Sequence, residues 1–181
     1  IVLNGSQNNI IRNNFVYHTG DNEFTQSKSG EPPTGITIAD EKQRADKHGL
    51  SPSSGNHIYN NVVVGMSVNF NCRESKNSGG ALIDTLVANN TFVNATNINV
   101  KIPAASHKSS RFINNLVVQD KGKIVTLPGG KGVTIANNLW SKSPGVAGEA
   151  VGDARLVNHG VSLGAAAWVG NYDLTEGSAL A

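Results

Sequence analysis

Charged side chains that could carry acid-base chemistry gather in residues 40–48 and 73–76, and a separate lysine follows at position 101. Cleavage of a uronate polymer by β-elimination needs a base for the proton beside the carboxylate and a cation for the enolate that forms. Hydrolysis of a glycoside needs two carboxylates, about 5 Å apart for retention of configuration or about 6.5–9.5 Å apart for inversion. The candidate catalytic residues are Lys101, Arg73 and Lys76 as bases or charge clamps, with Asp40 and Glu74 as a carboxylate pair. The candidate ligands for a calcium ion, a cation that prefers oxygen ligands, are Asp40, Glu41 and Glu74.

Five asparagine pairs, each bracketed by apolar residues, divide the chain into similar units. The second asparagines are separated by 47, 29, 25 and 23 residues, and a further apolar segment precedes each pair. Each unit therefore contains three short strands separated by turns. This pattern is typical of one coil of a right-handed parallel β-helix, in which the strands of successive coils stack about 4.8 Å apart. The second asparagines are Asn14, Asn61, Asn90, Asn115 and Asn138.

An asparagine that points inward at a bend costs free energy unless its amide finds partners above and below. We therefore predict an all-β fold with an asparagine ladder, built as a right-handed parallel β-helix of about five to six coils. Residues 1–140 are predicted to form the coils and residues 141–181 a C-terminal capping segment. An antiparallel sandwich would also give many short strands, but it would not require the asparagine pair in every unit. Because residue 1 lies inside a strand pattern, we expect the C-terminal part of a longer β-helix, or a chain whose leader was removed.

The repeat I-x-N-N-x-[FVL]-V followed by G-I-x-[IL] resembles the right-handed parallel β-helix superfamily, which includes pectate-lyase-like and other polysaccharide-active enzymes. The resemblance covers about residues 1–140, and residues 152–158 with 172–181 look like the closing segment of secreted bacterial β-helix proteins. It implies a secreted, carbohydrate-active protein. Because the superfamily also contains adhesins and structural proteins, a noncatalytic surface module is the alternative.

Three insertions lengthen the early units, within residues 17–34, 40–54 and 72–80. The first two flank the strand expected at 36–39 and the third follows the strand expected at 68–71, so the loops should border a groove with the sheet as its floor. Alternation along these strands predicts which polar side chains point outward to meet sugar hydroxyls. The predicted substrate-binding residues are Thr37, Asn69, Asn71 and Asn99, together with Arg44 in the second insertion.

The distribution of charge favours an anionic partner. Residues 101–131 contain six basic side chains and one acidic side chain, which would attract a polymer such as a polyuronate. Nucleic acid is not expected, because the net charge is only +2 and no aromatic stripe lies among the lysines. No apolar run reaches the roughly 18 residues of a membrane span. We expect an extracellular protein that binds an extended, anionic polysaccharide, with lyase, hydrolase and purely binding roles left open.

Overall fold

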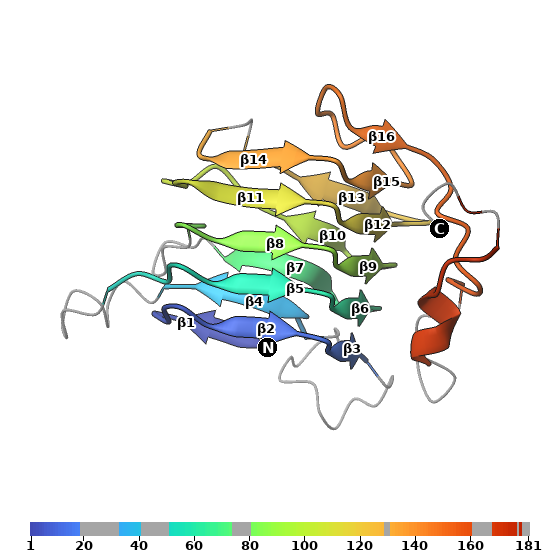
Figure 1. The fold of residues 1–181 in the computed structure, drawn as a ribbon, viewed down its shortest axis with the longest axis horizontal. Helices are drawn as coiled ribbons and strands as arrows, with labels where there is room; N and C mark the ends of the chain where they lie inside the picture. The colour runs from blue at the N-terminus through green and yellow to red at the C-terminus, as the bar shows by residue number, and fades with distance from the viewer. Residues whose placement is uncertain are drawn as a thin grey trace.

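The computed structural model describes residues 1–18, 33–40, 51–73, 81–128, 131–160, 168–176 and 178. Within these residues the chain forms sixteen short strands and one 3-10 helix (Figure 1). The strands make three sheets in which every pairing is parallel. The described residues include no helix long and apolar enough to cross a membrane. The predicted all-β class and the parallel pairing are confirmed.

Each sheet takes one strand from every repeat unit, so a strand pairs with the strand three elements further along the chain, except that β15 pairs with the next strand, β16. Sheet 1 contains β1 (Val2–Asn4), β4 (Ile36–Ala39), β7 (Val68–Arg73), β10 (Ile98–Lys101) and β13 (Lys123–Thr126). Sheet 2 contains β2 (Ile10–Arg12), β5 (His57–Tyr59), β8 (Leu86–Ala88), β11 (Ser110–Ile113) and β14 (Val133–Ala136). Sheet 3 contains β3 (Phe15–Tyr17), β6 (Val62–Val64), β9 (Thr91–Val93), β12 (Leu116–Val118), β15 (Leu139–Trp140) and β16 (Ala150–Val151). This order is compatible with a parallel β-helix.

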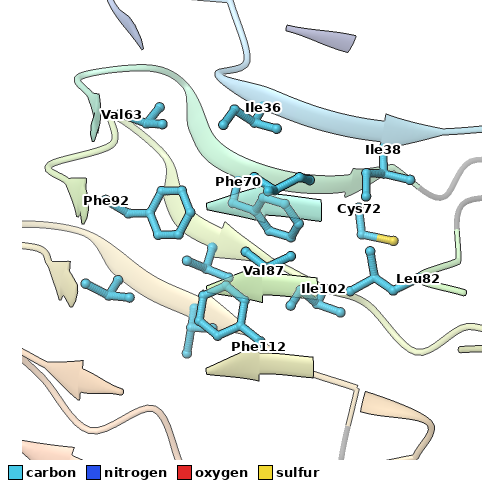
Figure 2. Close-up of a cluster of buried hydrophobic side chains, with 14 of the residues drawn as sticks. Ile36, Ile38, Val63, Phe70, Cys72, Leu82, Val87, Phe92, Ile102 and Phe112 are labelled. Carbon is cyan, nitrogen blue, oxygen red and sulfur yellow. The ribbon is translucent and has the colours of Figure 1, made fainter. Parts of the chain in front are cut away.

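A single apolar core lies between the sheets, because alternate residues of each strand point inward. Figure 2 shows Phe70, Phe92 and Phe112 from three different sheets close together in this core. Their ring centroids are 5.9–6.1 Å apart, in tilted or stacked arrangements. Trp140 extends the aromatic group by stacking on Phe112 at 5.9 Å, and its side chain is fully buried. These large rings lock the register of the strands that carry them.

The second asparagine of each pair enters one hydrogen-bonded row. Asn14 Nδ2 donates to Asn61 Oδ1 at 2.9 Å, and Asn61 Nδ2 donates to Asn90 Oδ1 at 2.9 Å. The row continues at 3.0 Å to Asn115 and at 3.0 Å to Asn138. The predicted asparagine ladder between strands is therefore confirmed. We call these five side chains the asparagine ladder.

The first asparagine of each pair turns the chain. All five have left-handed backbone torsions, with φ between 54° and 58°, and their side chains are exposed at the bend between sheets 2 and 3. Asparagine adopts this conformation more readily than other residues with a side chain. The pair therefore combines a turn residue with a buried ladder residue. The five turn residues are Asn13, Asn60, Asn89, Asn114 and Asn137.

The C-terminal segment, predicted as a cap, covers the outer face of sheet 3. After β16 the chain turns back and runs beside the strands toward β3 (Figure 1). Leu156 and Tyr172 belong to a second apolar cluster with Val64, Val93 and Val118 of sheet 3. The 3-10 helix η3 (Val169–Tyr172) ends this path. The C-terminal segment therefore covers the outer face of sheet 3, whereas sheet 1 forms a different face of the molecule.

Candidate functional site

Three of the predicted site residues lie side by side on sheet 1. The parallel register pairs Thr37 of β4 with Asn71 of β7, and Asn71 with Lys101 of β10. The same row continues to Thr126 of β13, which is not among the predicted residues. Neighbouring strands lie about 4.8 Å apart, so the row crosses four levels of the stack. We call Thr37, Asn71, Lys101 and Thr126 the sheet 1 row.

The row faces away from the core, because its neighbours along the strands, including Ile36, Phe70 and Val100, point into the core. Asparagine and threonine are poor choices for an apolar interior and good partners for hydroxyl groups, since their side chains both donate and accept hydrogen bonds. The stacking of β4, β7 and β10 is therefore what brings these polar groups from distant parts of the sequence into line.

Exposure and hydrogen bonding differ along the row. Thr37 is 3% exposed, and its hydroxyl donates to Thr34 Oγ1 at 2.9 Å. Asn71 is 7% exposed, and its Oδ1 is buried without a hydrogen-bond partner among the residues that the structure describes. Lys101 and Thr126 are partly exposed. A buried carbonyl oxygen left in this state costs about 1–3 kcal/mol, so Asn71 presents an unused acceptor next to a lysine.

Asp40 and Arg73 lie at the edge of sheet 1 where β4 and β7 end. Arg73 is the exposed last residue of β7 and pairs in register with Ala39, which directly precedes Asp40. Asp40 is partly exposed, and its Oδ1 accepts a hydrogen bond from Ser53 N at 2.8 Å. One carboxylate oxygen of Asp40 therefore anchors the returning chain, which leaves Oδ2 as its remaining group for chemistry.

The other predicted charged residues lie outside the described residues. They are Glu41, Arg44, Glu74 and Lys76, together with most of the three insertions. The second and third insertions follow residues 40 and 73, at the same edge of sheet 1, and the first precedes β4. In the part of the chain that the structure describes, no group of three or more His, Cys, Asp or Glu residues could hold a metal ion. The calcium site, which depends on Glu41 and Glu74, stays a prediction.

The expected outward orientation of Asn69 and Asn99 is wrong. Both side chains are completely buried, and Asn69 Nδ2 donates to Asn99 Oδ1 at 2.8 Å. Asn99 Nδ2 donates to Val118 O at 2.8 Å, so the amides hold together the bend between sheets 3 and 1. Simple alternation fails here because both residues lie beside a corner, where the chain turns over them. They form a second, shorter amide row.

A third polar row was also missed, at the bend between sheets 1 and 2. Asn9 Nδ2 donates to Asn56 Oδ1 at 2.9 Å, and further along the stack Ser110 Oγ accepts from Thr85 N at 3.0 Å. The mixed residue types explain why no repeat was visible at these positions. All three bends of the fold thus use buried side-chain hydrogen bonds.

The basic side chains of residues 101–131 do not form one compact patch. Lys101 and Lys123 belong to sheet 1, whereas Arg111 belongs to sheet 2. Lys108, Lys121 and Lys131 are exposed in the connecting segments. Sheet 1 therefore has two of these positive charges on neighbouring strands, but at opposite strand ends: Lys123 pairs with Ile98, whereas Lys101 pairs with Asn71, two residues before Arg73 of β7. No protein-family model, curated protein or solved structure matches this chain.

Proposed function

We propose that the chain is a right-handed parallel β-helix of about five to six coils that binds an extended, anionic polysaccharide along the sheet 1 row. The observation that carries the proposal is the in-register alignment of Asn71, whose buried acceptor is unused, with Lys101. Right-handed crossovers are the general rule for parallel strands. Since such polymers lie outside cells, the proposal includes secretion.

The geometry of the row suits a long polymer better than a compact ligand. Polar groups recur at each level of the stack, about 4.8 Å apart, which is close to the length of one sugar unit in an extended chain. Thr126 and Lys101, which are partly exposed, offer a donor at successive levels. Asn71 Oδ1 is buried, so the Asn71 side chain would have to turn outward to offer its acceptor to the polymer. Lys101 in the row and Arg73, two residues beyond Asn71 on β7, supply positive charge for the carboxylates of a uronate chain.

The same residues could support cleavage of the bound polymer. In β-elimination, Lys101 in its uncharged amine form would take the proton beside the uronate carboxylate while Arg73 stabilises the negative charge that develops. The glycosidic C4–O bond would then break as the C4–C5 double bond forms, and solvent water would protonate the departing oxygen. In hydrolysis, Asp40 would pair with Glu74 as acid and base or nucleophile. Hydrolysis requires Glu74, which lies outside the residues that the structure describes. Binding without cleavage by a surface module is the other candidate, and it needs only the row.

Binding is tested by titrating the protein with a polyuronate and with a neutral glucan of similar length. We expect preference for the polyuronate, an affinity that falls as salt increases, and a roughly 2–5-fold loss for Lys101→Ala. Lys108→Ala is the matched control, because Lys108 is an exposed lysine before β11 of sheet 2. Equal affinities of the two variants would contradict the assignment of the row.

The variant Asn71→Leu distinguishes an effect on polyuronate binding from an effect on the stability of the fold. Replacement of an unsatisfied buried acceptor by an apolar side chain of similar size should leave the free energy of unfolding unchanged or raise it by about 1–3 kcal/mol. The same change should weaken polyuronate binding. If binding is unaffected while the variant folds normally, Asn71 is not part of the site.

Cleavage is measured in parallel, from the ultraviolet absorbance of unsaturated ends and from the release of reducing ends. Unsaturated ends that disappear in Lys101→Ala would support elimination. Reducing ends without unsaturation that disappear in Asp40→Asn would support hydrolysis. Binding with neither product would identify a noncatalytic module.

A further inference from the structure

An aromatic pocket lies on sheet 3, away from the sheet 1 row. It is an open cavity of about 580 Å³ between the first strands of sheet 3 and the start of η3. Phe15 and Tyr17 form one wall, with ring centroids 4.8 Å apart, and Trp168 forms the other. Tyr17 is 40% exposed and Trp168 is 66% exposed. Large aromatic surfaces held open to solvent beside a cavity are typical of ligand-binding sites.

The Trp168 ring is held in place by a glycine. A Cβ atom added to Gly170 would lie 2.5 Å from two ring carbons of Trp168, so the ring lies directly against the backbone of Gly170. Gly170 itself is buried, and Asn171 N donates to Trp168 O at 3.0 Å. One face of the indole is therefore supported by the chain while the rest of the ring remains accessible.

Among the described residues that line the pocket, the polar side-chain groups are the Tyr17 hydroxyl and three asparagine amides. Asn13 and Asn60, the exposed turn residues of the first two asparagine pairs, lie at its rim with Asn14. No described residue that lines the pocket carries a charge. A ligand that matches this lining has an apolar face for the rings, hydroxyl groups for the amides and no net charge. A neutral pyranose has these three properties.

The asparagine ladder adds a directional acceptor at this position. Each ladder amide donates toward the next, and the last, Asn138, donates to Glu149 Oε2 at 2.8 Å. At the other end, Asn14 Nδ2 is used by Asn61 and by Arg12 O, whereas Asn14 Oδ1 has no partner among the described residues. Hydrogen bonds that run in one direction polarise one another, so the free Asn14 Oδ1 is a favoured acceptor for a hydroxyl donor.

We propose that this pocket is a second carbohydrate site, which binds one neutral sugar ring stacked on Trp168 with its hydroxyls on the asparagine amides. The site does not depend on the sheet 1 row, because it differs in location, in charge and in the class of ligand. It would hold a neutral residue or branch of a glycan while the row holds an anionic chain.

Tryptophan fluorescence gives a direct test on the whole chain. The chain has two tryptophans, and Trp140 is fully buried, so quenching by acrylamide reports Trp168. We would titrate the protein with the methyl glycosides of glucose, galactose, mannose and N-acetylglucosamine. At least one is expected to shift the emission and to reduce quenching in a saturable manner. Absence of any saturable change across the panel overturns the proposal.

Variants then locate the binding. Trp168→Phe, observed by calorimetry, should reduce affinity several-fold, because the smaller ring offers less stacking surface. Gly170→Ala should also weaken binding by displacing the Trp168 ring, although residue 170 does not line the pocket. Val157→Ala, at an exposed apolar residue outside the pocket, is the control and should bind normally.

The two sites are separable by cross-comparison. Trp168→Phe should leave polyuronate affinity unchanged, and Lys101→Ala should leave sugar-dependent protection of Trp168 unchanged. A loss of glycoside binding in Lys101→Ala but not in Trp168→Phe overturns the pocket assignment. Changes in Trp168 emission that depend on protein concentration without sugar would show self-association and would also overturn it.

Discussion

Replacement of Asn90, at the middle of the asparagine ladder, should destabilise the fold strongly. The Asn90 side chain is 1% exposed and takes part in four hydrogen bonds. Its Oδ1 accepts from Asn61 N at 3.0 Å and from Asn61 Nδ2 at 2.9 Å, and its Nδ2 donates to Ile58 O and to Asn115 Oδ1, both at 3.0 Å. At about 1 kcal/mol each these bonds contribute roughly 4 kcal/mol. The cavity and the stranded Asn61 N–H raise the expected cost of Asn90→Ala to about 4–6 kcal/mol.

Asn89 supplies a matched control, because it is the neighbouring asparagine of the same pair. Its side chain is exposed and its φ is 54°, so Asn89→Ala should cost only the left-handed strain of about 1–2 kcal/mol. Asn89→Gly should cost even less, since glycine adopts this conformation freely. The free energy of unfolding is obtained from urea titrations followed by circular dichroism.

The test compares the loss of unfolding free energy in Asn90→Ala with that in Asn89→Ala. If Asn90→Ala costs no more than Asn89→Ala, the ladder does not stabilise the fold as argued. A loss of cooperativity in Asn90→Ala, seen as a lower slope of the urea transition, would show that the levels of the stack unfold separately.

Three further predictions follow from single contacts. Glu149→Ala should lower the free energy of unfolding by about 2–4 kcal/mol, because Glu149 Oε2 accepts from Asn138 Nδ2 at 2.8 Å and from Trp140 Nε1 at 2.7 Å. Glu149→Gln should lower it less, because a glutamine oxygen can still accept these bonds. Urea titration measures both variants. Gly35→Ala should lower the melting temperature, because the added Cβ would lie 2.5 Å from Asn69 O, whereas Gly152→Ala, with its nearest atom at 3.9 Å, should have little effect. Burial raises the pKa of Tyr172 above 10.0. The stability that the neutral phenol contributes is therefore complete below about pH 10 and is lost as the pH rises through the raised folded-state pKa. Phenylalanine cannot ionise, so the melting temperature of Tyr172→Phe should fall less than that of the unmodified protein as the pH rises in that range.

The ladder could be predicted from sequence because the same residue type recurs at the same place in every unit. The interval from Asn14 to Asn61 is 47 residues and that from Asn61 to Asn90 is 29, because the insertions differ in length. Both Asn61 and Asn90 nevertheless follow a turn asparagine and precede an apolar strand. A buried amide that needs amides above and below imposes that repetition. The end of the ladder at Glu149 could not be predicted, because a single carboxylate in an irregular segment has no repeat to mark it.

The sheet 1 row could be predicted in part. Thr37, Asn71 and Lys101 follow strict alternation in strands whose other residues are apolar, so their outward direction was readable. Asn69 and Asn99 obey the same alternation but lie at a bend, where the next turn of chain covers them. Alternation describes a strand and fails at its corners, which is why these two amides were assigned to the wrong side.

The aromatic pocket could not be predicted from sequence. Tyr17 and Trp168 are far apart in the chain, and they meet because the C-terminal segment runs back along sheet 3 toward β3. Hydrophobic pattern alone indicates that such a segment must cover an apolar face, but it does not indicate which sheet or which direction. The contact of the Trp168 ring with the backbone of Gly170 likewise has no signal in the sequence.

The register of the stack is tested most directly by nuclear magnetic resonance of protein labelled with ¹⁵N-asparagine. We predict nuclear Overhauser effects between the side-chain amide protons of consecutive ladder residues, in the order Asn14, Asn61, Asn90, Asn115 and Asn138, with slow solvent exchange for the buried members. Contacts in another order, or fast exchange at Asn90, would contradict the alignment that places Thr37, Asn71 and Lys101 in one row.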